Sequence, residues 1–243
     1  MRVLLTNDDG IEAPGLQALH EAARNCFGET VEIVVVAPNR GRSECGHSVT
    51  TGRALRFERV RPGWISVDGT PVDCVRAALA SLIGEVDLVL SGVNAGANLG
   101  IDLLVSGTFA AAREAALHSV PAMAISHYRR PDVPVTWDHV PRWMKPTLET
   151  FVAELPKSAG KPRESTIPLW NVNLPAIDPG VEQPEIANCD VDTRPMHRAA
   201  NHDGEQLHLT TDFHGRPREQ GRDVELCFSG RLSVSKLPYP FGW

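Results

Sequence analysis

The chain has 243 residues, of which 42% are hydrophobic and 22% are charged, as in a globular protein with one large α/β domain or a core with a smaller appendage. Its formal net charge of −6 argues against a general affinity for nucleic-acid polymers or anionic membranes. A phosphate ester, if one binds, must therefore be attracted locally by a bound cation, a helix N-terminus or a few basic side chains.

The first ten residues, MRVLLTNDDG, contain only a short apolar run before two acids, so they do not resemble a signal peptide. No later segment approaches a membrane-spanning length. The five cysteines are widely spaced and form no CxxC pair. An odd number of cysteines without an export signal indicates reduced thiols, and we expect a cytoplasmic protein.

Short apolar runs that end at polar residues predict buried strands, and apolar residues repeated every three or four positions predict helices. The predicted strands are Val3–Thr6, Val31–Ala37, Val86–Leu90 and Pro121–Ser126. The predicted helices are Pro14–Cys26, Thr70–Ile83, Gly107–His118 and Trp137–Leu155. In addition, Arg53–Val60 and Trp64–Val67 are expected to pair as an antiparallel ribbon.

This alternation of strands and helices predicts an α/β fold in which helices cover both faces of a mostly parallel sheet. In such folds the ligand site lies outside the carboxyl ends of the strands. Three polar segments follow predicted strands and should converge there, namely Asn7–Gly10, Asn39–Ser48 and Ser91–Thr108.

We expect the α/β core to cover residues 1–180. Within it, Lys157–Thr166 has a linker-like composition and is predicted to be a surface loop, after which Leu169–Leu174 returns to a strand pattern. Residues 181–243 have too few periodic apolar residues for a core of their own. They are predicted to form an irregular, β-rich C-terminal extension with strand-like pieces at Gln206–Thr211 and Leu232–Lys236. We expect this extension to contain a β-hairpin that serves in oligomerisation.

Asp8 and Asp9 are adjacent carboxylates at the end of the first predicted strand, and a turn at Gly10 can aim both at one point. Two like charges held together require a cation, or one of the acids must take up a proton. The alternative is that the acids only cap the helix that begins near Pro14, which is a common use of aspartate.

Further oxygen donors come from the other converging loops. Ser43 offers a hydroxyl, and Asn94 and Asn98 offer amide carbonyls. Such an oxygen-only set suits Mg²⁺ or Mn²⁺ better than Zn²⁺, and no His/Cys cluster has zinc spacing. Taken singly, each asparagine could equally be a turn residue among glycines.

Ser106, Gly107 and Thr108 directly precede a predicted helix, where small residues and free backbone N–H groups form an anion site. Simple N-capping is the alternative, and both uses can coexist. No GxGxxG fingerprint or GxSxG elbow accompanies these residues. His47 could help to protonate a leaving group, or could make only a structural bond.

Several collinear stretches resemble the SurE family of survival-protein nucleotidases. They are MRVLLTNDDGIEAPGLQAL, VVAPNRGRSECGHSVT, VDGTPVDCV, SGVNAGANLGIDLLVSGT and NVNLP, and they span residues 1 to about 175. The later stretch GRDVELCFSGRLSVSKLP resembles the closing segment of the family more loosely.

The resemblance implies a Rossmann-like, three-layer fold whose C-terminal β-extension is exchanged between subunits, giving homodimers or homotetramers. It implies a phosphomonoesterase that hydrolyses nucleoside 5′- and 3′-monophosphates, with one divalent metal ion (Mg or Mn) per subunit. The implied metal ligands are Asp8, Asp9, Ser43 and Asn94. We expect Asp8 or Asp9 to orient or deprotonate the attacking water, and the alternative is that Asp8 is itself the nucleophile and forms an aspartyl-phosphate. The implied phosphate-binding residues are Asn98, Ser106, Gly107 and Thr108.

The chain also departs from the family pattern at four positions outside the implied ligands. Asn39, Ala97, Val105 and Arg222 stand where the family usually has Asp, Pro, Tyr and a small residue. Because none of these positions is an implied ligand, activity is still expected. Separately, two alternative functions stay open: an exopolyphosphatase, and a non-catalytic nucleotide-binding stress protein of the same fold.

Overall fold

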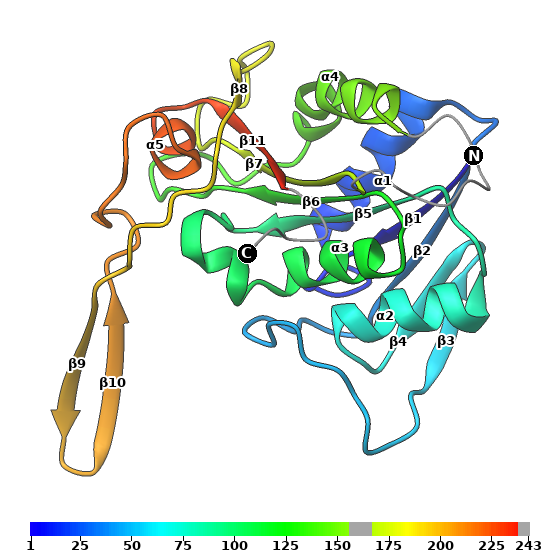
Figure 1. Cartoon of the computed structure of the whole chain (residues 1–243), viewed down its shortest axis with the longest axis horizontal. Coiled ribbons are helices and arrows are strands. Elements are labelled where there is room, and N and C mark those ends of the chain that lie inside the picture. The colour runs from blue at the N-terminus through cyan, green and yellow to red at the C-terminus, as the bar shows by residue number, and fades with distance from the viewer. Residues whose placement is uncertain (156–166, 238–243) are drawn as a thin grey trace.

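The structure is a computed structural model that describes residues 1–155 and 167–237, and its centre is a nine-stranded sheet with the strand order β3-β4-β2-β1-β5-β6-β7-β11-β8 (Figure 1). The strands are β1 (Arg2–Thr6), β2 (Glu32–Pro38), β3 (Phe57–Arg61), β4 (Trp64–Val67), β5 (Leu88–Ala95), β6 (Ala122–His127), β7 (Leu169–Leu174), β8 (Ile186–Asn188) and β11 (Leu232–Leu237). All neighbouring strands from β4 to β7 are parallel, whereas β3–β4 and β7–β11 are antiparallel. The predicted mostly parallel sheet and the predicted ribbon are both confirmed.

Helices cover both faces of the sheet (Figure 1). They are α1 (Pro14–Phe27), α2 (Pro71–Ala77), which continues into a π-helical turn (Ala78–Leu82), α3 (Gly107–Leu117), α4 (Val140–Ala153) and α5 (Asp223–Phe228). Helices α1 and α4 lie on one face, and α2 and α3 lie on the other. Strand β1 shows the reason, because Val3 and Leu5 enter one core while Leu4 enters the other. The three-layer architecture is therefore confirmed.

Two predicted helix starts have the expected chemistry. Thr70 caps α2 by accepting a hydrogen bond from the Asp73 amide at 3.1 Å, and the Asp73 carboxylate accepts one from the Thr70 amide at 2.9 Å. Pro14 occupies the first turn of α1, and a Cβ added at Gly15 would lie 2.0 Å from the Val93 carbonyl oxygen. The first turn of α1 therefore packs directly against β5.

Strand β5 differs from the prediction at its end. The predicted strand stopped at Leu90, but β5 continues to Ala95, so the first part of the predicted loop Ser91–Thr108 is strand. The physical reason is that β5 is central: Ser91 pairs with Thr6 of β1 and Ala124 of β6, which satisfies its backbone despite its polar side chain. The pairing with β6 shifts register between Ser91 and Asn94.

The C-terminal residues divide between the main sheet and a separate hairpin. Strand β11 lies between β7 and β8, and α5 packs through Val224 and Cys227 in a third cluster of apolar residues. Strands β9 (Arg198–Asp203) and β10 (Gln206–Thr211) form a hairpin that projects away from the body (Figure 1). The predicted strands at Gln206–Thr211 and Leu232–Lys236 are confirmed. The extension does contain a hairpin, but the residues of β9 were not assigned to a strand, and β8 and α5 were not predicted.

Two sequence expectations need separate mention. The predicted surface loop Lys157–Thr166 falls on residues 156–166, which are outside the described residues. Within residues 1–155 and 167–237, no helix is long and apolar enough to cross a membrane.

Candidate metal and phosphate site

A tight turn after β1 sets the positions of the two aspartates. The Asn7 side chain donates to the Gly10 carbonyl at 2.8 Å and accepts from the Gly10 amide at 3.2 Å. Gly10 has φ +103°, a conformation that favours glycine, and an added Cβ would lie 2.9 Å from the Arg40 backbone. Within this turn Asp8 is buried, with 6% of its surface exposed, while Asp9 is partly exposed.

Asp8 lies against the first turn of α3. The Thr108 hydroxyl donates to Asp8 Oδ1 at 2.7 Å, and a Cβ added at Gly107 would lie 2.9 Å from Asp8 Oδ2. Burial raises the pKa of Asp8 to about 6, with a further contribution from the charge of Asp9, although the Thr108 hydrogen bond acts in the opposite direction. The carboxylate form of Asp8 therefore lacks a compensating positive charge.

Asp9 is hydrogen-bonded to the end of β5, at the residue that follows Asn94 in the sequence. Asp9 Oδ2 accepts a hydrogen bond from the Ala95 amide at 3.0 Å. The Asn94 side-chain nitrogen donates to the Gly96 carbonyl at 2.8 Å, and its oxygen has no hydrogen-bond partner within the described ranges. An amide oxygen and two carboxylates thus lie at adjacent positions along the carboxyl edge of the sheet, as the sequence predicts for β1 and β5.

These donors fit a divalent cation. In the parts of the chain that the structure describes, no Lys, Arg or His forms an ion pair with Asp8 or Asp9. Nor does any group of three or more His, Cys, Asp and Glu there come close enough to hold a metal ion. A cation at the two aspartates would thus need neutral oxygens to complete its shell, and such oxygen ligands are those that Mg²⁺ and Mn²⁺ prefer.

The loop that carries Ser43 passes beside Asp8. The Arg42 amide donates to the Asp8 carbonyl at 2.7 Å, and Cys45 Sγ would lie 3.2 Å from a Cβ added at Gly107. Ser43 itself is exposed, and no hydrogen bond joins its hydroxyl to either aspartate. The structure brings the main chain of this loop to the site without fixing the Ser43 hydroxyl.

Two roles were predicted for the N-terminus of α3, N-capping and anion binding. Ser106 is the N-cap, since its hydroxyl accepts from the Phe109 amide at 3.0 Å. Gly107 and Thr108 form the first turn, whose amides lie at the positive end of the helix dipole. Capping is thus observed, and the first turn of the helix lies beside Asp8.

Asn98 is held on the neighbouring strands. Its side chain donates to the Ser126 hydroxyl at 2.8 Å, and its amide donates to Asn173 Oδ1 at 2.9 Å. Its carbonyl accepts from the side chains of Asn171 and Asn173, both at 3.0 Å. No contact within the described residues joins Asn98 to Asp8 or Asp9. The two β7 asparagines were missed as supports, although their i, i+2 spacing in LWNVNL indicates a shared face.

A second set of missed residues holds the segment between Asn98 and Ser106. The Gly100 amide donates to the buried carboxylate of Asp223 at 2.8 Å. Asp102 forms an ion pair with Arg216, whose side chain is only 1% exposed. The C-terminal residues therefore fix the loop that connects the two halves of the site, a long-range contact that no local sequence pattern reveals.

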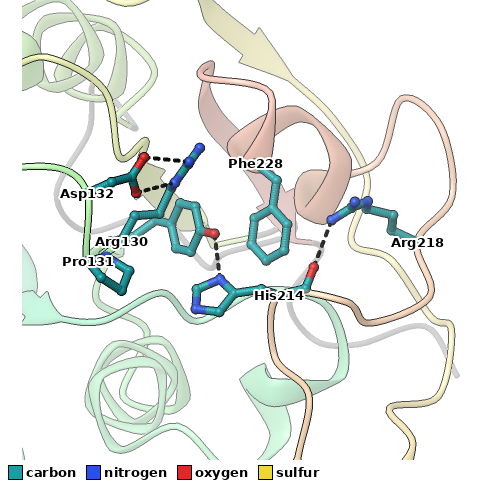
Figure 2. A pocket seen from close by; sticks show the side chains of 7 residues that line it. Arg130, Pro131, Asp132, His214, Arg218 and Phe228 are labelled. Carbon is teal, nitrogen blue, oxygen red and sulfur yellow. Dashed lines mark hydrogen bonds and ion pairs between the residues drawn. The ribbon is translucent and has the colours of Figure 1, made fainter.

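A pocket of about 370 Å³ also lies at this edge of the sheet, beyond β6 (Figure 2). It is lined by Tyr128, Arg130, Pro131, Asp132, His214, Arg218 and Phe228. Its polar groups bind one another: Arg130 pairs with Asp132 at 2.7 Å, and the Tyr128 hydroxyl lies 2.8 Å from His214 Nδ1. Because none of the predicted site residues lines it, this pocket is not the candidate metal and phosphate site.

Comparisons with known proteins point to a single family. The sequence profile described as "Survival protein SurE" matches residues 3–200. A Nostoc sp. protein that carries a provisional 5′-nucleotidase name is 39% identical over 98% of this chain and 99% of its own length. A Desulforudis audaxviator protein named 5′-nucleotidase SurE is 52% identical over 52% of this chain and 50% of its own length. The crystal structure of an Aquifex aeolicus Sure protein superposes with a TM-score of 0.79 at 28% identity, covering 98% of this chain and 93% of that one.

Proposed function

The chain belongs to the SurE family, and from this premise we propose that it is a divalent-metal-dependent 5′-nucleotidase. In this proposal it hydrolyses nucleoside 5′-monophosphates, and also 3′-monophosphates, to a nucleoside and phosphate. One observation carries the proposal: a buried carboxylate, Asp8, is hydrogen-bonded to the first turn of α3 at 2.7 Å. In this proposal Asp8 binds the cation and the adjacent N-terminus of α3 binds the phosphate. Metal-assisted hydrolysis of a phosphomonoester requires these two functions at one place.

Asp8, Asp9, Ser43 and Asn94 are the proposed metal ligands. The free side-chain oxygen of Asn94 and the unpaired charges of Asp8 and Asp9 support this assignment. When bound, Mg²⁺ or Mn²⁺ supplies positive charge for the phosphate oxygens and acidifies water.

The protein groups perform the remaining work. The amides of Gly107 and Thr108, together with the Asn98 segment, hold the non-bridging phosphate oxygens. The Ala95 amide orients the Asp9 carboxylate, and Asp8 or Asp9 accepts a proton from the attacking water. The new bond joins the water oxygen to phosphorus, the ester P–O bond breaks, and the nucleoside oxygen leaves with a proton from solvent.

The test is phosphate release from a panel of nucleoside 5′- and 3′-monophosphates with Mg²⁺, Mn²⁺ or EDTA. We expect metal-dependent release that Asp9→Asn abolishes. Release from polyphosphate alone would instead establish the exopolyphosphatase, and metal binding without any release would establish the non-catalytic nucleotide-binding protein.

We further propose that the hairpin β9–β10 binds a second copy of the chain. The hairpin projects away from the rest of the protein (Figure 1). Every residue of both strands is exposed, including Leu207 at 54% and Leu209 at 71%. Two exposed leucines on one face of a protruding ribbon are typical of a surface that is covered in an assembly. Analytical ultracentrifugation should therefore find a homodimer or homotetramer, and a monomer at micromolar concentration would contradict this proposal.

A cytoplasmic location is also proposed. All five cysteines are free thiols in the structure, which fits a reducing compartment. Fractionation of cells that express the tagged protein would test this location.

A further inference from the structure

Glu114, a buried carboxylate outside the candidate site, accepts hydrogen bonds from three basic side chains. Glu114 lies in α3 with its side chain 1% exposed. Its Oε1 accepts from Arg76 Nε of α2 at 2.6 Å and from His118 Nε2 at 3.1 Å, while its Oε2 accepts from His47 Nε2 at 2.9 Å. Burial acts to raise the pKa of Glu114, but the bonds from His47 and Arg76 outweigh burial and hold this pKa at about 2. Glu114 is therefore a fixed anion to which three segments attach.

His47 uses both of its ring nitrogens in this network. Arg113 donates from Nε and Nη2 to His47 Nδ1, at 3.0 and 2.9 Å. Arginine can only donate, so Nδ1 must be the acceptor and Nε2 must carry the proton that is given to Glu114. Neither nitrogen is then left to protonate a leaving group. The structural use of His47, which the sequence left open, is the one supported by this geometry.

The segment that His47 fastens is the loop of Ser43. The loop is bound at its start, where the Arg42 amide donates to the Asp8 carbonyl at 2.7 Å. It is bound at its end, where the Thr50 hydroxyl donates to Asp73 at 2.7 Å. Between these points, His47 is the side chain that ties the loop to α3, the helix whose N-terminus faces Asp8. Because Ser43 has no hydrogen bond of its own in the described structure, its position depends on these attachments.

We propose that Glu114 and His47 are positioning residues, which hold the Ser43 loop across the N-terminus of α3 and so set the distance between Ser43 and the aspartates. The inference rests on the proposed function only in assigning Ser43 to the metal. Supporting residues of this kind typically change metal affinity or activity by about 10- to 100-fold when they are removed.

The chain offers a matched control in His118. Both His47→Ala and His118→Ala remove one histidine bond to Glu114, but His118 follows α3 directly and ties no loop. His47→Gln is the conservative variant, since its amide nitrogen can replace Nε2 as donor. Glu114→Gln keeps the shape of the side chain but presents an amide nitrogen or a single oxygen to three donors, so at least one attachment is lost.

The experiment uses the full-length protein and three readouts: hydrogen exchange of residues 39–51, calorimetric titration with Mn²⁺ alone, and thermal unfolding. We expect His47→Ala to lose exchange protection in that segment and to bind Mn²⁺ about 10-fold more weakly, while His47→Gln stays within about threefold of wild type. His118→Ala should match wild type in exchange protection of residues 39–51 and in affinity for Mn²⁺. His47→Ala should also have the lower unfolding temperature of the two, because it loses both Arg113 bonds as well as its bond to Glu114.

Equal loop protection and equal Mn²⁺ affinity in the two alanine variants would overturn the proposal. If the wild type released no phosphate from any nucleotide, the proposed function would fail, yet hydrogen exchange and Mn²⁺ binding would still decide this inference. If the wild type bound no Mn²⁺, hydrogen exchange alone would decide whether His47 holds the loop.

Discussion

The carboxyl edge of the sheet and the hairpin β9–β10 are built on opposite principles. At the edge, Asp8 is buried and contacts groups from α3 and the Ser43 loop. In the hairpin all residues are exposed, and the backbone pairing from Gln206 to Thr211 is internal to the ribbon. The edge has more charge than this chain neutralises, whereas the hairpin has more apolar surface than this chain covers. Each region therefore points to a different missing partner, a cation in one case and a protein surface in the other.

The strongest test of the edge removes one of its charges. Asp9→Asn should lower kcat/KM for a nucleoside monophosphate by about 10³-fold, because several kcal/mol of transition-state stabilisation depend on the bound cation. Steady-state kinetics at saturating Mn²⁺ measure this effect. Asp132→Asn, at an exposed acid paired with Arg130, is the control and should retain wild-type rates. Comparable losses in both variants would contradict the assigned site.

A smaller effect is expected from the neighbour of Asp8. Thr108→Val keeps the shape of the side chain but removes the donor to Asp8 Oδ1, so we expect activity to fall about 10- to 100-fold. Thr147→Val is the matched control, because the Thr147 hydroxyl is buried without a partner in the described structure. Its loss should leave kcat/KM unchanged and the unfolding temperature equal or higher.

Acid should weaken the contribution of Glu114 to the stability of the fold. The pKa of Glu114 is about 2 in the folded chain, below the value of 4.5 expected when unfolded. Its ionised form therefore stabilises the fold above about pH 4.5, and this contribution is lost as pH falls toward 2. The free energy of unfolding of wild type should exceed that of Glu114→Gln by about 3 kcal/mol at pH 6. Urea titrations between pH 6 and pH 3 should show this gap narrowing, and a constant gap would contradict the buried network.

Substitutions in the hairpin should have the smallest effect on the stability and activity of the monomer. Leu207→Lys and Leu209→Lys together should shift sedimentation toward the monomer and change the unfolding free energy of that monomer by less than about 0.5 kcal/mol. Thr210→Lys, next to Leu209 on the opposite face of β10, is the control and should sediment like wild type. An unchanged assembly in the double variant would place the subunit interface elsewhere.

Local sequence patterns predicted the regions where local chemistry decides structure. The β1 run before Asp8 and Asp9, the Thr70-Pro71 helix start and the Ser106 cap were each evident from a few adjacent residues. The continuation of β5 to Ala95 was not, since it depends on strands β1 and β6 on either side. The apolar patterns of the strands therefore predicted the carboxyl edge of the sheet, but they placed the start of the loop after β5 too early, at Ser91.

The supports of the site were the least predictable part. Asp223 binds the Gly100 amide across 123 positions in the sequence, and Glu114 binds His47 across 67. Short elements were also hard to predict from the sequence. The six residues of α5, for example, make too few turns to show a helical period of apolar residues. The metal-binding and phosphate-binding roles of all the predicted site residues stay predictions. For Ser43 and Asn98, no hydrogen bond in the described structure joins the side chain to either aspartate.

The place of β11 has a consequence for how the chain can be made. Residues Leu232–Leu237 lie between β7 and β8, so one edge of β7 has no neighbour until this late segment has left the ribosome. During synthesis a nascent chain must keep that open edge from pairing with other chains, because an unpaired strand edge is a template for aggregation. The sheet can therefore close beside β7 only after Leu232–Leu237 has been synthesised.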